Sequence, residues 1–214
     1  MDISNQKVHF FGDSITYGWG MDEIGNSYVL RFREKYPNAE ISNYGVSGSS
    51  IAPHLNPKGL SRDRHFLMRV GEMTEGADLI VVFGGTNDFG QTDASPIGQW
   101  GDKSIDTFYG ALYVLYKDLI EKYPFANILV VTPLPRRDGA VKNVYGYLLQ
   151  DYVQAIIRTA NYFSLPILDL YRNSGMNPEM DIINELMFFD GLHPNEAGHK
   201  RIFERMDAYI KHLL

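Results

Sequence analysis

Short apolar runs alternate with longer amphipathic stretches along this chain. Five short runs are mostly apolar, as strands buried on both faces of a sheet are. These predicted strands are residues 8–11, 41–44, 79–83, 128–132 and 167–168. Five longer segments carry apolar residues at helical spacing. These predicted helices are residues 27–36, 63–74, 104–123, 144–163 and 195–213.

The alternation of strand and helix predicts an α/β fold. Strands that are joined through helices form right-handed crossovers, which build a parallel sheet between two helical layers. At 214 residues and 44% hydrophobic composition, the chain can bury a large core. We find no repeat or linker, so we expect a single domain over residues 1–214. The irregular segments 89–103 and 133–143 follow strand ends and are expected to border the mouth of a site.

Composition and charge narrow the class of protein. The net charge of -6 argues against nucleic acid or an anionic membrane surface as the main partner. There is no cysteine, which excludes disulfides, thiolate metal sites and a cysteine nucleophile, and which fits a reducing compartment. Residues 1–8 lack the features of a signal peptide, and no stretch is long enough to span a bilayer. We therefore expect a cytoplasmic protein without stable membrane insertion; its oligomeric state is not readable here.

Two motifs at opposite ends of the chain carry candidate chemistry. Ser14 ends the motif Phe-Phe-Gly-Asp-Ser, so it lies at the carboxyl end of the first predicted strand, the edge where parallel sheets bind ligands. Asp190 and His193 lie three residues apart in the turn Asp-Gly-Leu-His-Pro. A serine attacks an acyl carbon when an imidazole takes its proton and a carboxylate orients that ring. The sequence therefore predicts Ser14 as nucleophile, His193 as base and Asp190 as the partner of His193.

Two further loops offer hydrogen-bond donors for an oxyanion. Residues 43–49 follow the second predicted strand, and residues 84–88 follow the third. Glycine lets a backbone N–H approach a ligand closely, and asparagine adds an amide donor. Gly48 and Asn87 are therefore candidate oxyanion donors, and the N–H of Ser14, at a strand-to-helix turn, is a third. This chemistry requires no metal and no organic cofactor.

These residues form four blocks that occur together in a known family. The blocks are Gly12-Asp13-Ser14, Asn43-x-Gly45-x-x-Gly48, Gly85-Thr86-Asn87-Asp88 and Asp190-x-x-His193. In this order they resemble the SGNH superfamily, also called GDSL hydrolases, although the first block continues with Ile15 in place of leucine. The resemblance implies a flavodoxin-like three-layer α/β/α sandwich with about five parallel strands in the order 2-1-3-4-5. It also implies the same roles for Ser14, Gly48, Asn87, Asp190 and His193.

Several of these residues have structural alternatives. Ser14 could be a helix cap, and Asn87 with Asp88 could form a turn and an N-cap. We assign Asp13 a structural role in its own loop. The other histidines lack a comparable partner in sequence and are predicted to be structural or solvated: His9, His54, His65, His199 and His212. Of these, His54 lies just beyond the Gly48 loop.

The predicted function is hydrolysis of small-molecule carboxylic esters through an acyl-serine. Tyr17, Trp19 and Trp100 near the expected mouth favour a short acyl group on a polar, sugar-like alcohol, including carbohydrate O-acetyl esters. Lysophospholipase, thioesterase and acyltransferase activities stay open within the superfamily, because function depends on the loops. A two-metal phosphoesterase has too few histidine ligands here. A catalytically silent glycan-binding module would have had no need to keep all four reactive side chains.

Overall fold

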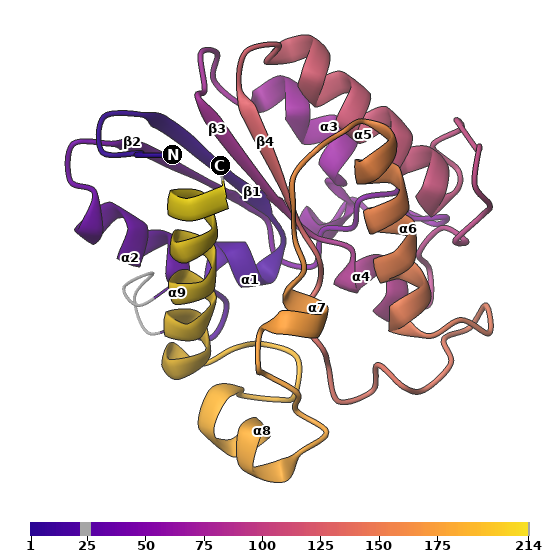
Figure 1. Ribbon diagram of the computed structural model, residues 1–214. Helices are drawn as coiled ribbons and strands as arrows, with labels where there is room; N and C mark the ends of the chain where they lie inside the picture. The colour runs from indigo at the N-terminus through magenta and orange to yellow at the C-terminus, as the bar shows by residue number, and fades with distance from the viewer. Residues whose placement is uncertain (22–26, 214) are drawn as a thin grey trace.

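Parallel strands form the centre of the molecule. The computed structural model describes residues 1–21 and 27–213. Within these residues the strands are β1 (Lys7–Gly12), β2 (Glu40–Gly45), β3 (Leu79–Phe83), β4 (Asn127–Val131) and β5 (Ile167–Leu168). Neighbouring strands are parallel, in the order β2-β1-β3-β4-β5 (Figure 1). The predicted strands and the order 2-1-3-4-5 are therefore confirmed.

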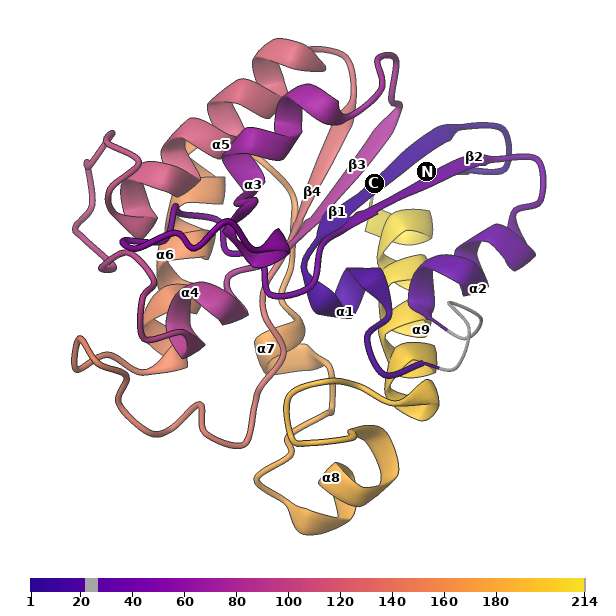
Figure 2. The same ribbon diagram turned by 180° about the vertical axis from the view of Figure 1, so that it is seen from behind.

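Two groups of helices cover the two faces of the sheet (Figure 1, Figure 2). The first group is α2 (Tyr28–Lys35) and α9 (Glu196–Leu213), and the second is α3 (Phe66–Arg69), α5 (Phe108–Lys122) and α6 (Leu149–Tyr162). Successive side chains of a strand point to opposite faces. Accordingly, Phe10 of β1 packs in the core under the first group, and Phe11 packs in the core under the second. This arrangement confirms the three-layer α/β/α sandwich.

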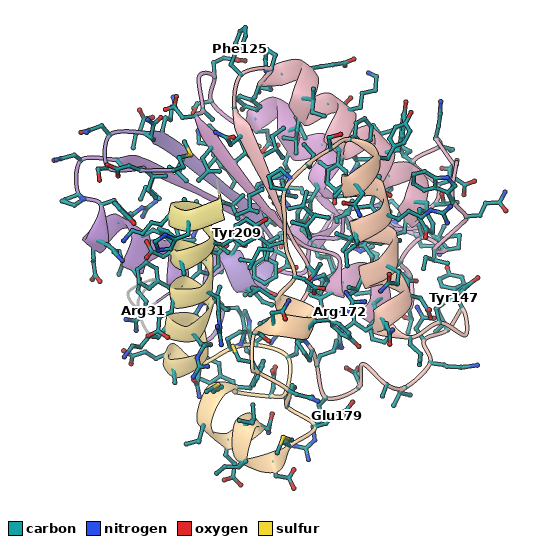
Figure 3. The ribbon with its side chains drawn as sticks, viewed as in Figure 1. Arg31, Phe125, Tyr147, Arg172, Glu179 and Tyr209 are labelled. Atoms are coloured by element: carbon teal, nitrogen blue, oxygen red, sulfur yellow. The ribbon has the colours of Figure 1, made fainter. Side chains whose placement is uncertain are left out.

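Short helices gather where the strands end. α1 (Ser14–Tyr17), α4 (Thr86–Gly90) and α7 (Leu170–Asn173) follow β1, β3 and β5, and α8 (Asp181–Met187) lies beyond α7. Figure 3 labels Phe125, which precedes β4 and so marks the amino ends of the strands, at the opposite end of the molecule from α8. The carboxyl edge of the sheet therefore carries the short helices and their loops.

The predicted helix over residues 63–74 is wrong. That segment contains the short α3 between two 3₁₀ turns, Ser61–Asp63 and Val70–Glu72. The Asp63 carboxylate accepts hydrogen bonds from the backbone N–H groups of Lys58 and Leu60, at 2.7 and 2.8 Å, and this turns the chain back on itself. At the other end, Arg69 reaches into the core to bond strand carbonyls. These contacts with other parts of the chain override the helical spacing.

Two other predicted helices begin later than expected because side chains shape the preceding turns. Thr107 accepts a hydrogen bond from the N–H of Gly110, so α5 begins at Phe108 and not at residue 104. The side-chain oxygen Oδ1 of Asn143 accepts hydrogen bonds from the N–H groups of Tyr145 and Tyr147, which makes residues 143–147 a turn. α6 therefore begins at Leu149 and not at residue 144.

No helix in the described part of the chain is both long enough and apolar enough to cross a membrane.

Candidate active site

Ser14 lies at a sharp turn between strand and helix. It is the first residue of α1, and the Asp13 carboxylate caps this helix by accepting the N–H of Ile15 at 2.9 Å. The turn is tight: a Cβ on Gly12 would lie 2.8 Å from the carbonyl oxygen of Phe83 in the next strand. Only glycine fits there, and the chain can then place Ser14 over the carboxyl end of the sheet, 5% exposed.

The ring of His193 lies between Ser14 and Asp190. Ser14 Oγ is 3.1 Å from His193 Nε2, although the two residues are 179 positions apart in the chain. His193 Nδ1 is 2.8 Å from Asp190 Oδ2. The structure thus brings together the three side chains that the two distant motifs single out, in one hydrogen-bonded row.

Asp190 is held by its own turn. Its Oδ1 accepts the backbone N–H groups of Leu192 and His193 at 3.0 and 2.7 Å. Burial raises the pKa of Asp190, but the hydrogen bonds from the backbone and ring of His193 and from Leu192 outweigh it and hold the pKa below its ordinary value. The carboxylate therefore stays charged beside the imidazole. Gly191, at φ 81°, makes the turn that lets Asp190 and His193 face the same way.

The two glycine-containing loops meet beside Ser14. Asn87, 8% exposed in the first turn of α4, donates one amide hydrogen from Nδ2 to the Ser49 carbonyl oxygen at 3.0 Å. Its second amide hydrogen is left for another acceptor. Gly48 precedes Ser49 and takes φ 75°. Within the described residues, the backbone N–H groups of Ser14 and Gly48 donate to no backbone carbonyl.

Asp88 connects the loop that follows β3 to the segment that follows Gly48. Its two carboxylate oxygens accept the backbone N–H groups of Ile51 and Ala52, each at 2.9 Å. Burial raises the pKa of Asp88 to about 6, against the effect of these hydrogen bonds. Asp88 therefore does more than shape its own turn, because it sets the position of the segment that follows Gly48.

Arg69, which sequence reasoning missed, ties two strand ends to the loop. Its guanidinium is buried and donates to the carbonyl oxygens of Tyr44 and Gly12, at 2.7 and 3.1 Å, and to Ser49 Oγ at 2.9 Å. The group lies over the rings of Phe11 and Phe66. Burial lowers the pKa of Arg69 to about 10, and the nearby Asp13 opposes that shift. The sequence did carry a signal for this role, because Arg69 lies within the apolar segment 66–70. A buried cation in such a segment needs buried hydrogen-bond partners.

Asp13 accepts a hydrogen bond within its own loop, from the N–H of Ile15. Burial raises the pKa of Asp13 to about 7, while the Ile15 N–H and the Arg69 charge pull it down and Asp88 raises it further. This supports the structural role predicted for Asp13.

Aromatic side chains border His193. The Trp19 ring lies 4.1 Å from the His193 ring, between centroids, with a 35° tilt, and the indole is 43% exposed. Phe189 packs against Gly20 next to it. The segment 133–143 also reaches the site, because the Arg137 N–H donates to the Gly191 carbonyl oxygen at 2.9 Å. That segment thus lies where the sequence placed it.

Trp100 does not join this border. It packs edge to face against Tyr109 of α5 and Tyr162 of α6, and the Arg158 guanidinium lies 4.4 Å from its ring centre. Trp100, Tyr109 and Tyr162 line a separate pocket of about 170 Å³. The prediction that Trp100 lies near the mouth is therefore wrong, because Trp100 packs against aromatic residues of α5 and α6.

Of the histidines that lack a comparable partner in the sequence, His54 has a carboxylate partner in the structure. His54 Nδ1 lies 2.9 Å from Asp63 Oδ1, and this pair braces the loop after Gly48. His9 is buried beside Thr74, and burial lowers its pKa to about 4. His199, whose Nδ1 accepts the Tyr28 N–H at 3.2 Å, is likewise buried with its pKa lowered to about 4. Both are structural, as predicted.

Among residues 1–21 and 27–213, no group of three or more His, Cys, Asp or Glu side chains is placed to hold a metal ion. The two-metal phosphoesterase alternative therefore lacks a ligand set in the described part of the chain.

A flavodoxin-like sheet with a serine, a histidine and a carboxylate in one hydrogen-bonded row at its carboxyl edge is an arrangement typical of acyl hydrolases. Comparison with known proteins gives the family. The model of the GDSL-like lipase/acylhydrolase family matches residues 10–201, and the chain belongs to this family. It is accordingly a carboxylic ester hydrolase.

Individual relatives and solved structures are similar to this chain over most of its length. An isoamyl acetate-hydrolyzing esterase of Schizosaccharomyces pombe is 26% identical over 97% of this chain and 78% of the relative. A crystal structure of a protein from Lactobacillus plantarum matches with a TM-score of 0.87 and 31% identity over the whole of both chains. The structure of a possible lipase from Chitinophaga pinensis has a TM-score of 0.72 and 21% identity, covering 96% of this chain and 98% of the other, and shows the shared fold.

Proposed function

We propose that Ser14 is the nucleophile of this ester hydrolase, with His193 as its base and Asp190 as the partner of the base. The observation that carries the proposal is the row of hydrogen bonds from Ser14 Oγ through the His193 ring to Asp190. His193 takes the hydroxyl proton as Ser14 attacks the ester carbonyl, and Asp190 orients the ring and stabilises its cation. The bond to the alcohol then breaks, and His193 gives the proton to the departing alcohol oxygen.

The oxyanion of the tetrahedral intermediate needs donors that are already in place. The N–H groups of Ser14 and Gly48 and the second amide hydrogen of Asn87 are the donors we assign to it. Water then attacks the acyl-serine while His193 takes its proton; the bond between the acyl carbon and Ser14 Oγ breaks, His193 returns the proton to Oγ, and the acid leaves. An acyltransferase would share every step up to the acyl-serine, and product analysis in the presence of an added alcohol separates the two activities.

Replacement of the nucleophile tests the proposal. We expect Ser14→Ala to lower the turnover of p-nitrophenyl acetate by several orders of magnitude, with an unchanged circular dichroism spectrum. An organophosphonate should label the native chain and not the variant. Ser104→Ala, an exposed serine on another loop, is the matched control and should keep native turnover. Turnover above a few per cent of native in Ser14→Ala would overturn the assignment.

The substrate we propose is an ester of a short acyl group whose alcohol lies against Trp19. The leaving oxygen must come within hydrogen-bond reach of His193 Nε2 to receive its proton. Because the Trp19 ring packs on the His193 ring, a substituent on that oxygen meets the indole. The isoamyl acetate-hydrolyzing relative supports a short acyl group. An indole face can pack against an alkyl chain or a sugar ring, so carbohydrate O-acetyl esters stay in the proposed class.

Separate alcohol and acyl series test the place of Trp19. We expect Trp19→Ala to raise KM for isoamyl acetate about 5-fold to 30-fold more than for methyl acetate, which corresponds to roughly 1–2 kcal/mol of lost contact. Trp19→Phe should recover part of the loss. The preference among acyl lengths on one fixed alcohol should stay as in the native chain. An equal loss on all acetates would show that Trp19 does not select the alcohol.

A cytoplasmic location and the lack of a nucleic-acid partner stay predictions of the sequence. Neither is needed for the chemistry proposed here.

A further inference from the structure

Gln91 lies between two of the proposed oxyanion donors. Its Nε2 donates to the Gly48 carbonyl oxygen at 2.8 Å and to Asn87 Oδ1 at 3.2 Å. We propose that Gln91 is a positioning residue. It sets the orientation of the Asn87 amide and the position of the Gly48 loop relative to that amide. This inference rests on the proposed function, because it concerns how the proposed oxyanion donors are held.

The Asn87 amide has two orientations that differ by a half-turn, and only one leaves a donor for substrate. In the observed orientation Nδ2 bonds the Ser49 carbonyl oxygen and Oδ1 receives Gln91. A half-turn would place the amide oxygen against the Ser49 carbonyl and the NH₂ group against the NH₂ group of Gln91. Both neighbours therefore select the same orientation. Asn87 is nearly buried, so water is a poor substitute for Gln91.

The orientation of Gln91 is itself set by Arg62. Arg62 Nη1 donates to Gln91 Oε1 at 3.2 Å, and a guanidinium can only donate. The glutamine oxygen must therefore face Arg62, which turns its NH₂ group toward Gly48 and Asn87. Arg62 is anchored in turn by Asp93, with N–O distances of 3.2 and 2.7 Å. Arg62 thus donates to both Asp93 and Gln91, which fixes the donor and the acceptor in each of these hydrogen bonds.

The Arg62 side chain also packs against the Gly48 loop. A Cβ built on Gly48 would lie 2.9 Å from Arg62 Cβ and 3.8 Å from Gln91 Nε2. The loop is therefore enclosed on the side where these two side chains lie. One row of polar residues, outside the four sequence blocks, holds both the backbone donor and the side-chain donor.

The physical consequence falls on the chemical step. Charge on the substrate oxygen develops only as Ser14 attacks, so donors that are misplaced cost more in the transition state than in the bound ester. Loss of a whole oxyanion donor costs about 100-fold to 1,000-fold in kcat. Loosening two donors without removing either should cost less, about 10-fold to 100-fold, with KM within about two-fold of native.

The test is Gln91→Met, which keeps length and volume and removes the two hydrogen bonds that Nε2 donates as well as the one that Oε1 accepts from Arg62. We expect kcat for p-nitrophenyl acetate to fall by the stated 10-fold to 100-fold. Gln154→Met, on the exposed side of α6, is the matched control and should stay within two-fold of native. If Gln91→Met does not fold, Gln91→Glu keeps the bond to Arg62 but cannot donate when ionised, and it should show the same loss of kcat.

A double-mutant cycle separates positioning from a merely structural role. In the Asn87→Ala background, the cost of Gln91→Met should shrink at least threefold, because one of the two donors it positions is already gone. An equal cost in both backgrounds, a loss confined to KM, or native kcat in Gln91→Met would overturn the inference. If Ser14→Ala also kept its activity, the proposed function itself would fall. If Ser14→Ala is inactive while Gln91→Met is native, only the role of Gln91 falls.

Discussion

At the residue scale, three buried ionisable groups hold the loops around Ser14. Asp13, Asp88 and Arg69 lie within the core near Ser14, and each is bonded to backbone groups of the surrounding loops. Burying such groups is costly unless each has partners, and removing one partner leaves the other exposed to that cost. The same groups that fix the loops therefore make the stability of the chain sensitive to pH.

The buried carboxyl of Asp13 predicts how the free energy of unfolding changes with pH. Its pKa is raised to about 7 in the folded chain, above the ordinary value of 3.8 that the unfolded chain keeps. Between about pH 4 and 7 the folded state holds a proton that the unfolded state has lost, so the contribution of Asp13 to the free energy of unfolding falls as pH rises. Asp13→Asn can still cap Ile15 but does not titrate. We expect this variant to remove part of that fall.

The measurement is urea unfolding of native chain and variant at pH 4.5 and pH 8. The native-minus-variant difference in the free energy of unfolding should change by a few kcal/mol at most between the two pH values, since each pKa unit corresponds to about 1.4 kcal/mol. Asp118→Asn, on the surface of α5, should keep the native pH dependence. A difference for Asp13→Asn that does not change with pH would contradict the buried, protonated carboxyl.

At the scale of elements, the turn between α8 and α9 determines whether the site exists. It places His193 opposite Ser14 and holds Asp190 by two backbone hydrogen bonds. The Asp-x-x-His spacing predicts this pairing because both side chains belong to one turn. The segment 63–74 shows the opposite case, since its helical spacing is overridden by Asp63 and Arg69, whose partners lie in other segments.

Gly191→Ala tests that turn. Alanine is strained at φ 81°, and its Cβ would lie 2.8 Å from Arg137 Cβ. We expect a loss of about 1–3 kcal/mol in stability and at least a 10-fold fall in kcat, because small shifts of His193 away from Ser14 are costly. Gly76→Ala, at φ 76° with open space around the Cβ, has the backbone strain without the clash. It should lose stability and keep kcat; equal kcat in the two variants would contradict our view of the turn.

At the scale of the whole molecule, one sheet joins both cores. Phe10 and Phe11 are neighbours in β1 yet belong to different cores, so neither core can open without disturbing β1. We therefore expect residues 1–214 to behave as a single domain that unfolds in one transition. Calorimetry checks this: the calorimetric and van't Hoff enthalpies should agree. Two resolved transitions would show that the two helical layers are independent.

The sequence by itself determined the strands, their parallel order through the family resemblance, and the residues that the structure brings together at the carboxyl edge. These features depend on local apolar runs, on glycine turns and on short motifs, which are legible from neighbours in the chain. Only the tertiary structure decided that Arg69 points inward, that His54 pairs with Asp63, that Trp19 covers His193 while Trp100 packs elsewhere, and that Gln91 links two loops. The physical reason is that each of these depends on a contact between segments whose distance in space no local pattern encodes.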